Sequence, residues 1–212
     1  MKFKYCLFFL ILFLIFNISS ISAKEISNDY FYNLEKNITN ESKFEENGIK
    51  LQFKTKKSIE KEHLFLKQYL ISRLNGKYTN VDDKSFKISN EKINAWVNLW
   101  NIKDYTYVEI TLININSEYN TKHLEELVEN IKKTDIKDIQ IFLYYKGMID
   151  NSKSLEDFRE LKSLEDLNVL NINNGYTGTG NSKLGRKMNF ALVRYNDKSH
   201  IIIGTPIIFT TY

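Results

Sequence analysis

Side chains suited to nucleophilic catalysis and metal binding are few in this sequence. Its 212 residues include one cysteine, Cys6, and three scattered histidines, His63, His123 and His200. These leave little for a zinc site, and the sequence lacks the G-x-S-x-G motif that would present a serine nucleophile. We therefore expect no metal, no cofactor and no catalytic residue set.

Carboxylates are the remaining candidates for chemistry, because glycan hydrolysis needs two of them across a cleft. Acidic runs occur at Asp82-Asp83, Glu125-Glu126-Glu129 and Glu165-Asp166. Such runs are typical of solvated helices and loops, and sequence spacing does not place two acids face to face. An envelope enzyme that acts on wall glycan through carboxylates such as Glu109 is therefore the alternative interpretation.

A glycine-rich segment over residues 175–180 suggests a phosphate-binding loop. It lacks the Lys-Ser/Thr ending of a Walker loop, and it follows a predicted helix where a dinucleotide-binding loop follows a strand. We interpret it as a turn in which glycine supplies a positive φ. A role in partner contact stays open, with the candidate residues Asn174, Gly175, Tyr176, Thr177 and Gly178.

The most informative pattern is an alternation of aliphatic and polar or aromatic residues over 93–101. Successive strand side chains point to opposite faces, so Trp96 and Trp100 would share one side of a sheet. On the next predicted strand, Tyr105 and Tyr107 would point the same way. The same face would receive these amide, carboxylate and lysine side chains: Asn94, Asn98, Glu109, Lys50, Gln52, Lys54 and Lys56.

Two interpretations of this face stay open. In the first, the aromatic residues cover a second core, through self-dimerisation or through an added segment such as a helix over 28–46. In the second, Trp96, Trp100, Tyr105 and Tyr107 form a binding surface, because exposed aromatic patches are often interaction sites. Aromatic rings with amide neighbours suit either a protein partner or a wall glycan.

Periodicity predicts the elements that would position these residues. Helices are expected over 28–46, 59–74, 123–133 and 155–169, the second with Ile59, His63, Leu66, Leu70 and Leu74 on one face and ended by Asn75-Gly76. Strands are expected over 49–56, 86–89, 93–101, 105–116, 138–145, 187–195, 199–203 and 207–211.

This order repeats itself. The succession α-β-α-β-β-β occurs twice, with a breakpoint near Glu118, although the halves share no residue-level identity. We predict an α+β fold: a single domain over 24–212 with pseudo-repeat halves of about 24–118 and 119–212, and helices on one face of an antiparallel-rich sheet.

The first 23 residues have the order of a secretory signal peptide. Lys2 and Lys4 precede an apolar run that becomes polar at Asn17, and Ala23 ends a small-residue cleavage site. The run is shorter than the roughly 20 apolar residues that span a bilayer. We expect a secreted protein at the outer face of the membrane or in the wall, with membrane contact only through an uncleaved signal.

Three C-terminal segments together resemble the YwmB-like family of secreted proteins from Gram-positive bacteria. They are residues 174–178 (NGYTG), 189–195 (NFALVRY) and 203–208 (IGTPII), before a terminal Tyr212. The resemblance implies a fold like the TATA-box-binding saddle, and the family has no established activity.

Charge argues against a nucleic-acid partner. Removing residues 1–23 lowers the formal charge from +4 to +2, and the two halves share it about equally, whereas phosphate binding needs a concentrated basic surface. We expect a non-enzymatic, extracytoplasmic binding module of the cell envelope. Its expected partner is an envelope protein or wall glycan, with homodimerisation as a further option.

Overall fold

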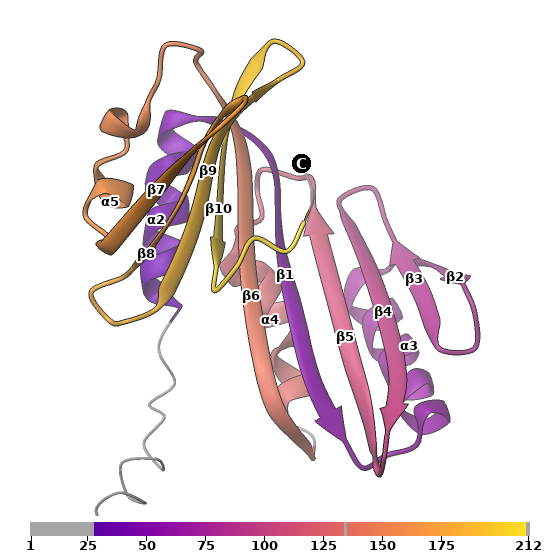
Figure 1. Ribbon diagram of the computed structural model, residues 1–212. Helices are drawn as coiled ribbons and strands as arrows, with labels where there is room; N and C mark the ends of the chain where they lie inside the picture. Colours follow the sequence, from indigo (N-terminus) through magenta and orange to yellow (C-terminus); the bar gives the residue numbers. More distant parts are fainter. Residues whose placement is uncertain (1–27, 134, 211–212) are drawn as a thin grey trace, which may run out of the picture.

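The chain folds into one antiparallel sheet with helices packed on one of its faces (Figure 1). The computed structural model describes residues 28–133 and 135–210. Within them the sheet has ten strands and there are four α-helices, which confirms the α+β prediction. The predicted signal peptide over 1–23, with Cys6, lies outside the described residues.

The elements follow one another in two runs. The first comprises α2 (Asp29–Glu41), β1 (Lys43–Thr55), α3 (Ile59–Leu74), β2 (Lys77–Asn80), β3 (Ser85–Ser89), β4 (Ile93–Ile102) and β5 (Tyr105–Asn114). The second comprises α4 (Thr121–Val128) with a 3-10 turn (Glu129–Lys133), β6 (Ile136–Ile149), a 3-10 turn (Leu155–Asp157), α5 (Arg159–Lys162), β7 (Glu165–Ile172), β8 (Gly175–Asn181), β9 (Lys187–Tyr195) and β10 (Lys198–Thr205). The strand order is β2-β3-β4-β5-β1-β6-β10-β9-β8-β7, with every neighbouring pair antiparallel.

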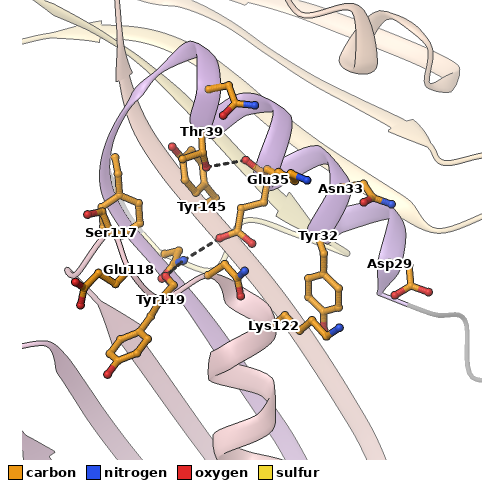
Figure 2. A pocket seen from close by; sticks show the side chains of 15 residues that line it. Asp29, Tyr32, Asn33, Glu35, Thr39, Ser117, Glu118, Tyr119, Lys122 and Tyr145 are labelled. Atoms are coloured by element: carbon orange, nitrogen blue, oxygen red, sulfur yellow. Dashed lines mark hydrogen bonds between the residues drawn. The ribbon is translucent and has the colours of Figure 1, made fainter.

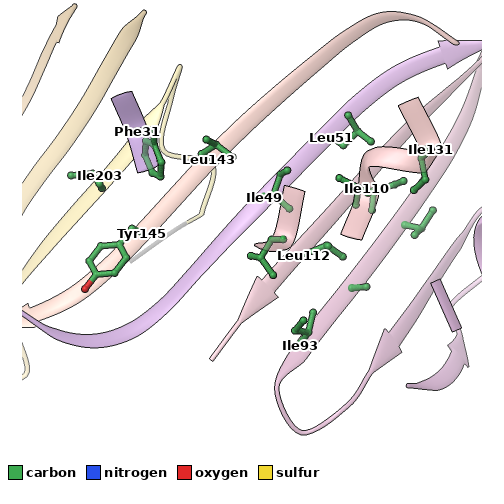
Figure 3. Close-up of a cluster of buried hydrophobic side chains, with 14 of the residues drawn as sticks. Phe31, Ile49, Leu51, Ile93, Ile110, Leu112, Ile131, Leu143, Tyr145 and Ile203 are labelled. Atoms are coloured by element: carbon green, nitrogen blue, oxygen red, sulfur yellow. The ribbon is translucent and has the colours of Figure 1, made fainter. Parts of the chain in front are cut away.

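The main core lies between the helices and the sheet (Figure 3). Alternate residues of the central strands, such as Ile49, Leu51 and Leu143, are buried against helical residues such as Phe31 and Leu66. Each such side chain stabilises the fold by about 2 kcal/mol through burial. This packing fixes the register, because a slip of one residue would turn the apolar set to solvent.

Helix α3 was predicted with its correct bounds, because its ends carry local signals. The Ser58 side chain accepts a hydrogen bond from the backbone N–H of Lys61, and Asn75 adopts a left-handed conformation whose N–H bonds to Ile71. The predicted apolar face needs one correction. Glu62 points into the core with Leu66. His63 lies at the boundary of the core, as expected for a core or boundary histidine, with its ring centroid 4.7 Å from that of Phe86 in an edge-to-face arrangement.

The buried Glu62 yields a prediction for the pH dependence of stability. Its carboxylate has an ion pair with Lys57 at 3.5 Å but no hydrogen bond, and burial raises its pKa against the opposing effect of Lys57. The folded protein therefore loses stability as pH rises from the ordinary glutamate range through the raised pKa. We expect Glu62→Gln to stabilise the protein by about 1 kcal/mol at neutral pH.

Denaturant unfolding of both proteins at about pH 7 and about pH 4 measures this effect. The advantage of Glu62→Gln should vanish at the lower pH, where the wild-type carboxyl is protonated. Glu60→Gln, on the exposed side of the same helix, is the matched control and should bring no gain at neutral pH, because hydrogen bonding to Ser58 lowers the pKa of Glu60. An advantage equal at both pH values would contradict the proposed cost of burying the charge.

The N-terminal elements have different bounds from those predicted. The helix expected over 28–46 ends at Glu41, and the strand expected over 49–56 begins at Lys43. The reason is tertiary: Phe44 packs edge-on against Tyr145 at 6.0 Å, and β1 pairs along both sides, with β5 and β6. Because α2 covers the helix side of the sheet, it cannot cover the tryptophan face, as one interpretation required.

The C-terminal region differs most from the prediction. The helix expected over 155–169 is reduced to one 3-10 turn and the four residues of α5, and the unpredicted strand β7 follows. The glycine-rich segment is not a turn but strand β8. Residues 207–210 form no strand, although one was predicted over 207–211, and β2 is a further unpredicted strand.

Candidate functional site

The two tryptophans lie where the alternation placed them, on the sheet face that no helix of the described residues covers. In β4, residues Ile93, Ala95, Val97 and Leu99 are buried, whereas Trp96 and Trp100 are each 36% exposed. Four residues apart on one strand, they lie about 13 Å from each other at roughly 3.3 Å per residue. We call the outward side of β3, β4, β5 and β1 the open aromatic face.

Neighbouring side chains hold both tryptophan rings. Trp100 stacks on Tyr107 of β5 with ring centroids 5.8 Å apart and an interplanar angle of 19°. The Lys87 ammonium lies 5.0 Å from the centre of the Trp96 ring. Such stacking and cation–π contacts reduce the freedom of exposed rings, so the aromatic surface is preorganised.

Polar groups lie between and beside the rings. Gln52 donates to Glu109 at 2.6 Å, and Lys50 pairs with the same carboxylate at 3.4 Å. Asn98 lies opposite Glu109 in the strand register. A continuous row of amide and carboxylate groups therefore crosses β4, β5 and β1.

Lysines on this face have acidic or aromatic partners. Lys54 forms an ion pair with Asp138 and lies 5.0 Å from the centre of the Tyr105 ring. Together with the Lys50–Glu109 pair, this leaves no concentrated basic surface among the described residues of the face. The face is suited to stacking and hydrogen bonding more than to binding phosphate.

Further along the sheet the same face is covered by the chain itself. After β10, residues 206–210 cross in front of the central strands (Figure 1). Phe209 packs on Tyr144 at 5.6 Å, and Ile208 contributes to the same cluster with Ala191, Val193 and Ile202. The Asn189 side chain also donates to the carbonyl of Pro206. We call residues 206–210 the C-terminal strap.

The strap and the open aromatic face adjoin each other. Lys50 lies 5.4 Å from the centre of the Phe209 ring while it pairs with Glu109. The strap could not be predicted from the sequence, because the contact of Phe209 with Tyr144 joins residues 65 positions apart. The run Ile207-Ile208-Phe209 is an apolar signal, but it does not distinguish a strand from a segment that crosses a sheet.

A polar cluster lies beside the strap. His200 is 3% exposed, its ring stacks on Tyr195 at 3.8 Å, and its Nε2 lies 3.3 Å from Glu45. Lys146 lies 3.4 Å from the other oxygen of Glu45. Burial raises the pKa of the Tyr195 hydroxyl, an effect that Lys146 opposes. The Lys146–Glu45 ion pair is internal to the fold, and the burial of His200 leaves its imidazole out of a ligand's reach.

The glycine-rich candidates serve packing. A Cβ on Gly178 would lie 2.3 Å from the Phe190 ring, and one on Gly175, whose φ is +147°, would lie 2.0 Å from the carbonyl oxygen of Leu192. Glycine is thus needed for close approach between β8 and β9 and, at residue 175, also for backbone conformation.

The other candidates in this segment also have local partners. Tyr176 packs on the helix side and its hydroxyl accepts from the backbone of Leu155, Thr177 donates to Phe190 at 2.9 Å, and Asn174 bonds with Arg194. Four strands separate β8 from β5, which is about 24 Å at about 4.8 Å per strand. The structure therefore does not bring the two groups of candidates together.

A cleft of about 560 Å³ lies on the helix side, between α2 and the segment that leads into α4 (Figure 2). Its size is within the range of ligand pockets. Its lining is mostly polar and includes Tyr32, Lys36, Tyr119 and Lys122, with Glu35 at its base.

Glu35 is the most conspicuous acid in this cleft, but structural contacts occupy it. Asn47 donates to it at 2.8 Å, and Thr121 donates through its backbone N–H at 3.1 Å and through its hydroxyl. Burial raises the pKa of Glu35, and these hydrogen bonds oppose that effect. The carboxylate thereby caps the first turn of α4 from α2, which is a positioning role in the fold.

Comparisons with known proteins identify no family for this chain. No protein-family model matches the chain, and no curated protein matches it. Within residues 28–133 and 135–210, no helix is long and apolar enough to cross a membrane. The same part of the chain contains no group of three histidine, cysteine or acidic residues that could hold a metal ion.

Proposed function

We propose that this chain is a non-enzymatic, extracytoplasmic binding module of the cell envelope whose ligand lies on the open aromatic face. One observation carries the proposal: Trp96 and the Trp100–Tyr107 pair present held but exposed rings on a face that none of the described helices covers. The strap buries the neighbouring part of that face. The strap thus covers neighbouring side chains on the same side of the sheet and leaves these aromatic rings exposed.

A wall glycan is the ligand that these side chains fit best. Flat ring faces stack on sugar rings, and the row formed by Asn98, Glu109 and Gln52 supplies hydrogen-bond donors and acceptors for hydroxyl groups. The roughly 13 Å between the tryptophans suits an extended polymer more than a single sugar. The test must therefore distinguish a glycan ligand from a protein partner that binds the same rings.

Binding is better supported than hydrolysis. Among the described outward residues of β3, β4 and β5, Glu109 is the single acid, and Lys50 and Gln52 engage it. Two further outward acids, Glu45 and Glu46, lie at the start of β1 beside the strap, where Lys146 and Tyr144 engage them. A glycan hydrolase needs a second carboxylate across a cleft. The ion pairs of Lys50 with Glu109 and of Lys54 with Asp138 also argue against a nucleic-acid partner on this face.

We also propose that residues 24–212 form one domain of two similar halves, related as in the TATA-box-binding saddle. In support, the succession α-β-α-β-β-β-β occurs over 29–114 and again over 121–205. The strand order β2-β3-β4-β5-β1 is followed by the corresponding strands in reverse, β6-β10-β9-β8-β7. The resemblance to the YwmB-like family implies such a fold and an exported protein.

The test of function is retention on purified ligands. The chain is incubated with insoluble peptidoglycan and, separately, with immobilised envelope proteins, and released sugars are analysed alongside. We expect retention on peptidoglycan without release of sugars. Retention on envelope protein alone would indicate a protein partner instead of a glycan. Release of sugars would indicate an enzyme that acts on wall glycan.

Export gives a separate prediction. We expect signal cleavage after Ala23, so that the protein released outside the membrane begins at Lys24. N-terminal sequencing of secreted material measures this directly. Recovery of the uncleaved chain in the membrane fraction alone would contradict cleavage and indicate an anchor.

A further inference from the structure

The two edges of the sheet differ in length and composition. At one edge β2 has four residues and includes Lys77. At the other edge β7 has eight residues, with Val169, Leu170 and Ile172 exposed. Soluble proteins usually protect a sheet edge by keeping it short or by adding lysine or proline. Edge β2 has such protection, whereas β7 has neither lysine nor proline along its length.

The register shows which backbone groups of β7 have no partner among the strands of residues 28–133 and 135–210. Ile172 pairs with Gly175 across the two-residue turn Asn173–Asn174, so Ile172, Leu170 and Asn168 bond to β8. Alternation then directs the N–H and C=O groups of Val169 and Asn171 to the open edge. These groups are oriented to pair with a further antiparallel strand.

The side chains of β7 fit a second copy of the same strand. In an antiparallel pairing centred on Val169, that residue faces its own copy and Asn171 faces Leu167 of the second copy. The acids of β7, Glu165 and Asp166, lie at one end, so this pairing keeps them away from the acids of the other copy. A parallel pairing would place like charges together, which destabilises a sheet.

We propose that β7 pairs with β7 of a second copy and joins two sheets across this edge. The interface combines the free backbone groups of Val169 and Asn171 with apolar contacts made by Val169 and Leu170. It lies at the far end of the sheet from β4. The proposal is therefore independent of the ligand proposed for the open aromatic face.

Sedimentation velocity on the chain over 24–212 tests the pairing. We expect a dimer in the micromolar range and at least a tenfold weaker dimer for Leu170→Lys. Leu170 is 60% exposed, so its replacement should leave the melting temperature unchanged. Thr79→Lys, on the exposed edge β2, is the matched control and should dimerise like wild type.

A second variant separates the backbone contribution from that of the side chains. Val169→Pro removes an N–H directed to the open edge and leaves the hydrogen bonds to β8 in place, so it should also dissociate the dimer. Because the only cysteine is Cys6, Val169→Cys in the chain over 24–212 should cross-link between copies, and Thr79→Cys should not. A wild-type monomer throughout the micromolar range, or a dimer that survives both edge variants, would overturn the proposal.

Discussion

Replacing Trp96 and Trp100 together with alanine is expected to abolish measurable retention on peptidoglycan while the protein stays folded. Loss of one aromatic anchor commonly costs about 2 kcal/mol of binding, or some thirtyfold in affinity. Both rings are 36% exposed, so each replacement should cost about 2 kcal/mol of stability, from partial loss of burial together with the stacking and cation–π contacts.

Retention assays beside thermal melts of each variant measure the two effects. Trp96→Phe with Trp100→Phe keeps aromatic faces and should retain part of the binding. Leu64→Ala, at an exposed apolar residue on α3, is the control for a general loss of surface hydrophobicity. If the double alanine variant instead unfolds, with a cost of about 3–5 kcal/mol per residue, the rings belong to a core. If it retains ligand like wild type, the open aromatic face is not the binding surface.

Glu35→Ala is expected to destabilise the protein by about 3 kcal/mol or more, because it removes the acceptor for several buried donors. Both Thr121 donors would lose their acceptor and the Asn47 amide would keep only the Tyr119 carbonyl, so the first turn of α4 would depend on its Asn120 cap alone. For a chain of this length that loss corresponds to a fall of roughly 6–12 °C in melting temperature.

Calorimetry of Glu35→Ala beside Glu35→Gln measures this effect. Glutamine keeps one acceptor oxygen, so its cost should be clearly smaller. Below the melting transition, Glu35→Ala should still bind the ligand of the open aromatic face, since the cleft lies on the helix side. If Glu35→Ala instead has normal stability and does not bind the ligand, the result would indicate that the ligand binds in the cleft and not on the open aromatic face.

Elements with local signals could be predicted from the sequence. The period of two in β4 and β5 identified the buried and exposed sides correctly, and Lys103-Asp104 forms the turn between them, with a positive φ at Lys103. Helix α3 was predictable because capping residues mark both ends. Each of these signals lies within a few residues of the structure that it specifies.

Elements determined by distant contacts could not be predicted. Leu161, Leu164 and Val169 fit a helical period, but pairing with β8 turns the last part of that segment into a strand. Glycines normally interrupt strands, and those of β8 are accommodated because Phe190 packs onto Gly178. Both outcomes depend on which segment becomes the neighbour, and the local pattern does not carry that information.

The candidate site was predictable in part for the same reason. Alternation placed Trp96 and Trp100 on one face, but nothing local indicated that Lys87 would lie over Trp96. The local pattern also could not show that Phe209 would cover Tyr144 next to that face. The strap is the feature that distinguishes the covered part of the helix-free face from the open one.

The most direct test of the binding proposal is tryptophan fluorescence during a titration with soluble peptidoglycan fragments. The chain has two tryptophans, and both lie on the open aromatic face, so the signal reports on that surface alone. We expect a saturable spectral change and protection of both rings from acrylamide quenching. Retention on peptidoglycan with unchanged tryptophan emission and unchanged quenching would show that the ligand binds elsewhere and would contradict the account.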